Sequence, residues 1–226
     1  MSLDDAKQRA ARAALDYLPA SGIVGLGSGS TAQLFIEEVA QLVARGRSLV
    51  GIATSGDSRA LAERLGIPLL ADDGPWDIAV TVDGADEVSE NLDVIKGGGG
   101  CQTREKIVNQ ASALNIIVVD ESKLSKQLGE KWPVPVEVLA FGHQSTREQL
   151  RAFGPTTLRT KNGTPWLTDA GNYLYDVKVG LMSEPAATDA LLRSLPGVVE
   201  TGLFCQRAQR VLVAGPSGLQ TLERPR

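Results

Sequence analysis

The sequence has little of several residue types that mark particular protein classes. Among 226 residues there are two cysteines and one histidine, and no C-x-x-C pair, so we expect no metal centre built from cysteine and histidine. The formal net charge of −4 argues against a broad nucleic-acid-binding surface. No apolar run is long enough to span a bilayer, and the amphipathic N-terminus does not resemble a signal peptide. We therefore expect a cytoplasmic protein without metal, nucleic acid or membrane.

Short apolar stretches alternate with amphipathic ones through the first half of the chain. Strands are predicted over 23–27, 48–54, 67–70, 78–82 and 116–120, and helices over 4–18, 28–44, 57–66 and 103–113. Strands that are apolar throughout and alternate with helices favour a Rossmann-like α/β fold, a parallel sheet with helices on both faces. Ligands of such sheets bind beyond the carboxyl ends of the strands.

The pattern changes near Pro133-Val134-Pro135. Strands are predicted over 136–140, 156–159, 173–179 and 198–204, and helices over 146–153 and 185–195. This β-α-β-β-α-β order is that of a smaller α+β, ferredoxin-like domain. A last strand over 211–214 can return to the first sheet. We therefore predict an α/β core over 1–132 and 208–226, with an inserted domain over 133–207.

The segment KGGGGCQTREK, residues 96–106, is the most informative part of the sequence. Its glycines expose backbone N–H groups to an anion or a hydroxylated ligand. Lys96 precedes them and can stabilise a developing negative oxygen, while Glu105 can act as a base. The alternative for Glu105 is an acid that complements the helix dipole. A catalytic role therefore requires that Glu105 be shielded from water.

The segment GLGSGST, residues 25–31, follows a predicted strand and opens a helix. Its N–H groups and hydroxyls suit a phosphate. It is not a full dinucleotide fingerprint, because Ser30 occupies the third glycine position and the next strand ends in Thr54-Ser55 rather than an acid. A monophosphate fits better than NAD. The alternative is a tight turn with a capping serine.

Two carboxylates, Asp83 and Asp86, flank a glycine turn at another strand end. They can hold sugar hydroxyls or relay protons, or they can form a solvated Asx-type turn. Lys123 follows a further strand and can reach a phosphate, and Lys7 is a second candidate cation; both can equally be surface charges. His143 lies away from these loops, and we interpret it as structural or surface.

Together these segments resemble ribose-5-phosphate isomerase, type A. The motifs GLGSGST, TSGDS, VDGADE, IKGGGGCQTREK, DESK, PVPVEV, TDAGNYLYDV and PGVVETGLF come in that family's order. The resemblance covers nearly the whole chain. It implies interconversion of D-ribose 5-phosphate and D-ribulose 5-phosphate through an enediolate, without a cofactor, in the pentose phosphate pathway. It also implies a homo-oligomer, a dimer or a tetramer.

The resemblance assigns roles residue by residue. It implies that Glu105 is the catalytic base, with Asp83, Asp86 and Lys96 as the other catalytic groups. The substrate-binding set that it implies is Lys7, Ser28, Gly29, Ser30, Thr31, Asp83, Gly84, Ala85, Asp86, Lys96, Gly97, Gly98, Gly99 and Lys123. Two departures are Ser28, where the family commonly has threonine, and TSGDS, where many members have a run of serines.

Two other classes of function use related scaffolds. Sugar-phosphate sensing domains of transcription regulators bind without chemistry, but they usually carry a helix-turn-helix, whereas here the first helix leads almost directly into the sheet. Amino-sugar deaminases and acyl-CoA transferases form the second class. A deaminase usually has a histidine near its catalytic acid, and His143 lies in a different segment.

Overall fold

The structure is a computed structural model that describes residues 3–216 and 218–224. The chain divides into two compact units. Unit 1 contains the described residues up to Ala85, then Arg104–Lys123, and those from Gln206 onward; unit 2 consists of Asp86–Thr103 and Leu124–Cys205. The inserted domain over 133–207 remains a prediction.

Unit 1 is built on a six-stranded sheet with the order β16-β15-β6-β3-β1-β2. The strands are β1 Ser21–Leu26, β2 Ser48–Ala53, β3 Ile78–Asp83, β6 Ser112–Asp120, β15 Arg210–Gly215 and β16 Gly218–Glu223. All neighbours are parallel except β16, which pairs with β15 in the antiparallel sense. The predicted return of the last strand to this sheet is confirmed by β15. Strand β16 was not predicted.

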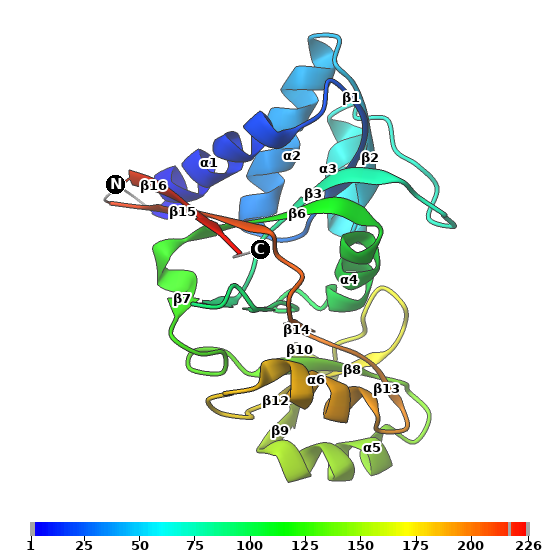
Figure 1. The fold of residues 1–226 in the computed structure, drawn as a ribbon. Helices are drawn as coiled ribbons and strands as arrows, with labels where there is room; N and C mark the ends of the chain where they lie inside the picture. The colour runs from blue at the N-terminus through cyan, green and yellow to red at the C-terminus, as the bar shows by residue number, and fades with distance from the viewer. Residues whose placement is uncertain (1–2, 217, 225–226) are drawn as a thin grey trace. The chain divides into compact units, whose positions relative to one another are not determined.

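Helices cover both faces of this sheet, as predicted (Figure 1). Helices α1 (Leu3–Ala13), α2 (Ser30–Ala44) and α3 (Gly56–Arg64) share one buried cluster with Val24 and Leu26 of β1. Ile23, the residue before Val24, points to the opposite face, because the side chains of neighbouring residues in a strand alternate. There Ile23 packs with Val108 of α4 (Gln102–Gln110). A short 3₁₀ helix, η1 (Ala14–Tyr17), follows α1.

A predicted strand and a predicted helix end in unit 1 are wrong. Residues 67–70 form a single bridge, Gly51 to Leu69, rather than a strand. Pro68 lacks the N–H that a longer ladder would require. Helix α4 ends at Gln110 instead of Ala113, because β6 begins at Ser112.

Unit 2 contains a four-stranded antiparallel sheet with the order β13-β8-β12-β9. The strands are β8 Val134–Val138, β9 Thr156–Leu158, β12 Tyr173–Val177 and β13 Val198–Thr201, with helices α5 His143–Leu150 and α6 Pro185–Arg193. The predicted ferredoxin-like order is therefore confirmed. The 3₁₀ helix η3 (Arg151–Phe153) follows α5, and a small hairpin, β10 (Thr160–Lys161) with β11 (Thr164–Pro165), lies between β9 and β12.

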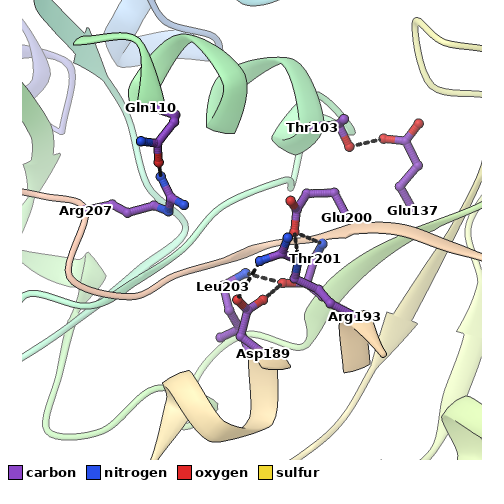
Figure 2. A network of polar contacts seen from close by, with 9 residues as sticks. All are labelled: Thr103, Gln110, Glu137, Asp189, Arg193, Glu200, Thr201, Leu203 and Arg207. Carbon is purple, nitrogen blue, oxygen red and sulfur yellow. Dashed lines mark hydrogen bonds and ion pairs between the residues drawn. The ribbon is translucent and has the colours of Figure 1, made fainter. Parts of the chain in front are cut away.

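The predicted strand 198–204 is divided at Gly202. Its second part, β14 (Leu203–Phe204), belongs to a different sheet. A Cβ at Gly202 would meet the carbonyl oxygen of Lys96 at 2.2 Å, so the chain can pass there only as glycine. Polar contacts hold the end of β13: Thr201 Oγ1 bonds to Asp189 of α6 and accepts the Leu203 N–H at 3.2 Å (Figure 2).

A second small sheet in unit 2 was not predicted. Its order is β14-β5-β4-β7, with β4 Glu87–Ser89, β5 Val94–Ile95 and β7 Leu124–Ser125. The 3₁₀ helix η2 (Glu121–Lys123) of unit 1 precedes β7 in the chain. Asp86 directly precedes β4 and Lys96 directly follows β5, so this sheet fixes the ends of the glycine-rich loop. No helix among residues 3–216 and 218–224 has the length and apolarity to cross a bilayer.

Candidate active site

The turn between β1 and α2 is held tightly against the end of β3. The Gly27 N–H donates to the Val82 carbonyl at 3.0 Å, and the Ser28 N–H donates to Asp83 Oδ1 at 2.9 Å. The hydroxyls of Ser28 and Thr54 are 2.7 Å apart. Helix α2 begins at Ser30, after Gly29 with φ 86°. The first N–H groups of α2 therefore lie at the carboxyl end of the sheet, where they can bind an anion.

Asp83 is the last residue of β3 and is 4% exposed. Its Oδ1 accepts the N–H groups of Ser28 and, at 2.8 Å, of Gly84. A Cβ at Gly27 would approach Asp83 Oδ1 to 2.3 Å and its Cα to 2.5 Å. Gly27 is thus required for the carboxylate to lie over the turn. The structure thus brings the N–H groups of Ser28 and Gly84 together at Asp83.

The predicted cations of unit 1 lie at two places. Lys7 of α1 and Ser30 of α2 line one cavity of about 400 Å³, together with Asp4, Asp5, Gln8 and Leu34. Thr31, the next residue of α2, is 9% exposed. Lys123 ends η2, just after β6, and is half-buried. Lys7 therefore lies beside the α2 N-terminus, while Lys123 follows the end of another strand of the same sheet.

Glu105 lies in the first turn of α4 and is 4% exposed. Glu105 is therefore shielded from water, which a role as catalytic base requires. The start of the helix is anchored by Thr103, whose hydroxyl donates to Glu137 of β8 (Figure 2). Glu137 is 1% exposed and also accepts hydrogen bonds from Thr168 and Asn172, each at 2.8 Å.

The glycine-rich loop belongs to unit 2. Lys96 is 3% exposed, and its Nζ lies 5.7 Å from the centroid of the Phe204 ring. The Gly98 N–H donates to Asp86 Oδ2 at 2.7 Å, and the Gly100 N–H donates to the Gly97 carbonyl at 2.9 Å. Gly97 and Gly100 have φ of 102° and 76°, which favour glycine. Asp86 and the glycine-rich loop are therefore brought together.

The predicted site residues divide between the two units. Unit 1 holds Lys7, Ser28, Gly29, Ser30, Thr31, Asp83, Gly84, Ala85, Glu105 and Lys123, and unit 2 holds Asp86, Lys96, Gly97, Gly98 and Gly99. The chain passes from one unit to the other between Ala85 and Asp86, and again between Thr103 and Arg104. The motif that contains Asp83 and Asp86 and the motif that contains Lys96 and Glu105 are therefore each divided between the two units.

His143 contributes to the packing of unit 2, as interpreted from the sequence. Its Nδ1 lies 2.7 Å from the hydroxyl of Tyr175, and its ring centroid lies 4.5 Å from that of Tyr173. Burial raises the pKa of the Tyr175 hydroxyl above its ordinary value, and Arg147 partly offsets this increase. Among the described residues, no group of three or more histidine, cysteine or acidic side chains could hold a metal ion.

Three polar residues near the glycine-rich loop were not predicted from the sequence. Glu137 gives a signal, because it is a single charge within the apolar strand VPVEV. Gln102 is fully buried, and neither polar atom of its side chain has a hydrogen-bond partner among the described residues. Nothing in the sequence points to Arg159, because it binds backbone carbonyls of the loop, which are not visible as a residue pattern.

Comparisons with known proteins agree on one family. A family model described as ribose 5-phosphate isomerase A (phosphoriboisomerase A) matches residues 50–218. The chain is 41% identical, over 233 residues and the full length of both proteins, to ribose-5-phosphate isomerase A of Rhodopseudomonas palustris strain BisB18. A solved D-ribose-5-phosphate isomerase in complex with phospho-erythronic acid superposes with TM-score 0.95 at 37% identity, covering 99% of this chain and 100% of that one. Ribose 5-phosphate isomerase A of Methanocaldococcus jannaschii superposes with TM-score 0.92 at 36% identity, covering 98% and 100%.

Proposed function

The chain belongs to the ribose 5-phosphate isomerase A family, and we propose that it interconverts D-ribose 5-phosphate and D-ribulose 5-phosphate with Glu105 as the general base. The protein is an isomerase of the pentose phosphate pathway. The observation that carries the base assignment is a carboxylate that is 4% exposed and lies in the first turn of α4, directly after the glycine-rich loop in sequence.

The reaction begins with opening of the furanose ring, assisted by Asp83. Glu105 then removes the proton from C2, and an enediolate forms. The protonated Glu105 returns the proton to C1, while Asp83 or a water molecule moves the hydroxyl proton from O2 to O1. A positioned base of this kind contributes about 10²–10⁴-fold to the rate.

Lys96 and the N–H groups of the glycine-rich loop stabilise the negative oxygen of the enediolate. The burial of Lys96, at 3% exposure, supports this role, because a charge–charge interaction is stronger where water is excluded. Asp86 binds a substrate hydroxyl in this proposal. Its carboxylate is held in place by the Gly98 N–H.

The phosphate is bound by the N-terminus of α2 and by the cations of unit 1. The cavity lined by Lys7 and Ser30 supports this placement, since it joins a cation to a helix N-terminus. Ser28, Gly29, Thr31 and Lys123 complete the set. Binding at the phosphate supplies energy that positions C2 for proton transfer.

A coupled assay with ribose 5-phosphate, run beside glucosamine 6-phosphate, tests the activity. We expect turnover of the pentose phosphate alone, undiminished by a chelator. Glu105→Gln should lower kcat by about 10²–10⁴-fold with a smaller change in KM. Lys123→Ala should mainly raise KM. Near-normal turnover by the Glu105→Gln protein would exclude Glu105 as the base, and turnover of the amino sugar would favour a deaminase.

A cytoplasmic location and assembly into a homodimer or homotetramer are also part of the proposal. They follow from membership of the family rather than from the contacts of a single chain. Light scattering coupled to size-exclusion chromatography measures the mass directly. A monomer at assay concentration would exclude the assembly.

A further inference from the structure

Arg159 of unit 2 makes an unusual set of contacts with the glycine-rich loop. It follows strand β9, and its side chain is 12% exposed. Its Nη1 donates to the carbonyl oxygen of Gly97 at 2.7 Å and to that of Gly98 at 3.1 Å. One guanidinium nitrogen therefore fixes the directions of two consecutive carbonyls.

The guanidinium is itself held in one orientation. Its Nε donates to Asp176 Oδ2 at 2.9 Å, and its Nη2 bonds to Asp176 Oδ1. The ring of Trp166 lies 5.6 Å from its Cζ. The bidentate pair with Asp176 and the nearby ring of Trp166 therefore leave the guanidinium little freedom to rotate.

Fixing a carbonyl also fixes the N–H on the other side of the same peptide. In a trans peptide the two groups point in opposite directions. The Gly97 carbonyl shares its peptide with the Gly98 N–H, which indeed points away and donates to Asp86. The Gly98 carbonyl shares its peptide with the Gly99 N–H. Gly99 is exposed, and a Cβ there would meet no atom within 4 Å, so the space beside this residue is open.

The charge of Arg159 also strengthens these two donors. A cation that binds a carbonyl oxygen draws electrons through the peptide, and the N–H becomes a stronger hydrogen-bond donor. Arginine keeps its charge at every pH of a normal assay. Arg159 can therefore act on an anion that it does not touch.

We propose that Arg159 is a positioning residue of the isomerase reaction, which aims and polarises the Gly98 and Gly99 N–H groups. Through Gly98 it orients Asp86, and through Gly99 it strengthens a donor to the negative oxygen of the enediolate. This inference rests on the proposed role of the glycine-rich loop. A purely structural ion pair with Asp176 would not require the two carbonyl contacts, which distinguish the two roles.

The kinetic test compares Arg159→Met and Arg159→Lys with Arg151→Met. Arg151 is a suitable control, because it lies in the same unit and its pair with Glu148, at 3.0 Å, is exposed. We expect Arg159→Met to lower kcat by about tenfold to 10²-fold, since it weakens rather than removes oxyanion donors. KM should change by less than about threefold. Arg159→Lys should recover part of kcat, because an ammonium can reach the carbonyls but cannot pair with Asp176 through two nitrogens.

The spectroscopic test needs no substrate. In ¹H–¹⁵N spectra of the folded variants, the amide protons of Gly98 and Gly99 should shift upfield in Arg159→Met and remain in place in Arg151→Met. If Arg159→Met does not fold, Arg159→Lys and Asp176→Asn provide the comparison. Unchanged amide shifts, or unchanged kcat with only a lower Tm, would overturn the inference. An inactive wild-type protein would instead refute the proposed function, while the amide shifts would still report on Arg159.

Discussion

The two units fix their functional groups by different physical means. In unit 1 an apolar parallel sheet presents strand ends and a helix N-terminus, so Asp83 and the β1–α2 turn follow directly from the sheet. In unit 2 fully buried carboxylates organise the loops. Glu87 and Glu137 are 0% and 1% exposed. A buried charge is tolerated only where hydrogen bonds compensate its desolvation.

Glu87 shows this second means most clearly. Its two oxygens accept four backbone N–H groups, from Gly129, Glu130, Lys131 and Trp132, at 3.0–3.2 Å. The carboxylate thereby fixes the loop that leads into β8. At its turn, unit 1 combines close packing at Gly27 with the hydrogen bonds of Asp83, whereas unit 2 depends mainly on the charge of fully buried side chains. The following substitutions test that difference.

Gly27→Ala should have the largest effect on stability. The new methyl group would overlap both the carboxylate and the Cα of Asp83, and the backbone of a central strand cannot move aside. We expect the free energy of unfolding to fall by about 3 kcal/mol or more. Urea denaturation followed by circular dichroism measures it. Gly99→Ala is the matched control, since its methyl group meets no atom within 4 Å and should leave stability within about 0.5 kcal/mol. Equal stabilities would contradict close packing at the turn.

Glu87→Gln should have the next largest effect, without any change in size. The amide nitrogen would face backbone N–H groups that the carboxylate oxygen accepts. Leaving buried donors unsatisfied costs about 2–3 kcal/mol. The same denaturation experiment applies, with the exposed Glu90→Gln as control. If the Glu87→Gln and Glu90→Gln proteins have the same midpoint urea concentration of unfolding, the charge of Glu87 does not organise unit 2.

Gln102→Met should have the smallest effect and the opposite sign. The side chain of Gln102 is fully buried, and its two polar atoms have no partner among the residues that the structure describes. Methionine has a similar length and carries no desolvation cost, so stability should rise by about 1 kcal/mol. Thermal unfolding measures the change. The control is Gln149→Met, an exposed position of α5; a drop in Tm for Gln102→Met would show that the amide is satisfied.

Most candidate site residues could be chosen from the sequence because they lie in short motifs at strand ends. A strand that is apolar throughout and followed by glycine or aspartate predicts both the element and the place of the chemistry. That reasoning singled out Ser28 and Asp83, and in the structure the Ser28 N–H donates to Asp83 Oδ1. The roles of Glu105 and Lys96 remain predictions.

The elements that were missed carry no such local pattern. Strands β5, β7 and β14 have two residues each, too few to show a period of two. The chain leaves one sheet for another at Gly202 because of atoms that are distant in sequence, the Lys96 carbonyl and Pro135. Arg159 binds backbone carbonyls, which every residue possesses, so no type of partner residue indicates its position in the sequence.

The chain passes from one unit to the other inside two of its motifs, between Asp83 and Asp86 and between Thr103 and Glu105. Unit 1 alone would hold Asp83 without Asp86 and Glu105 without Thr103. Each of these two motifs is therefore complete only in the intact chain.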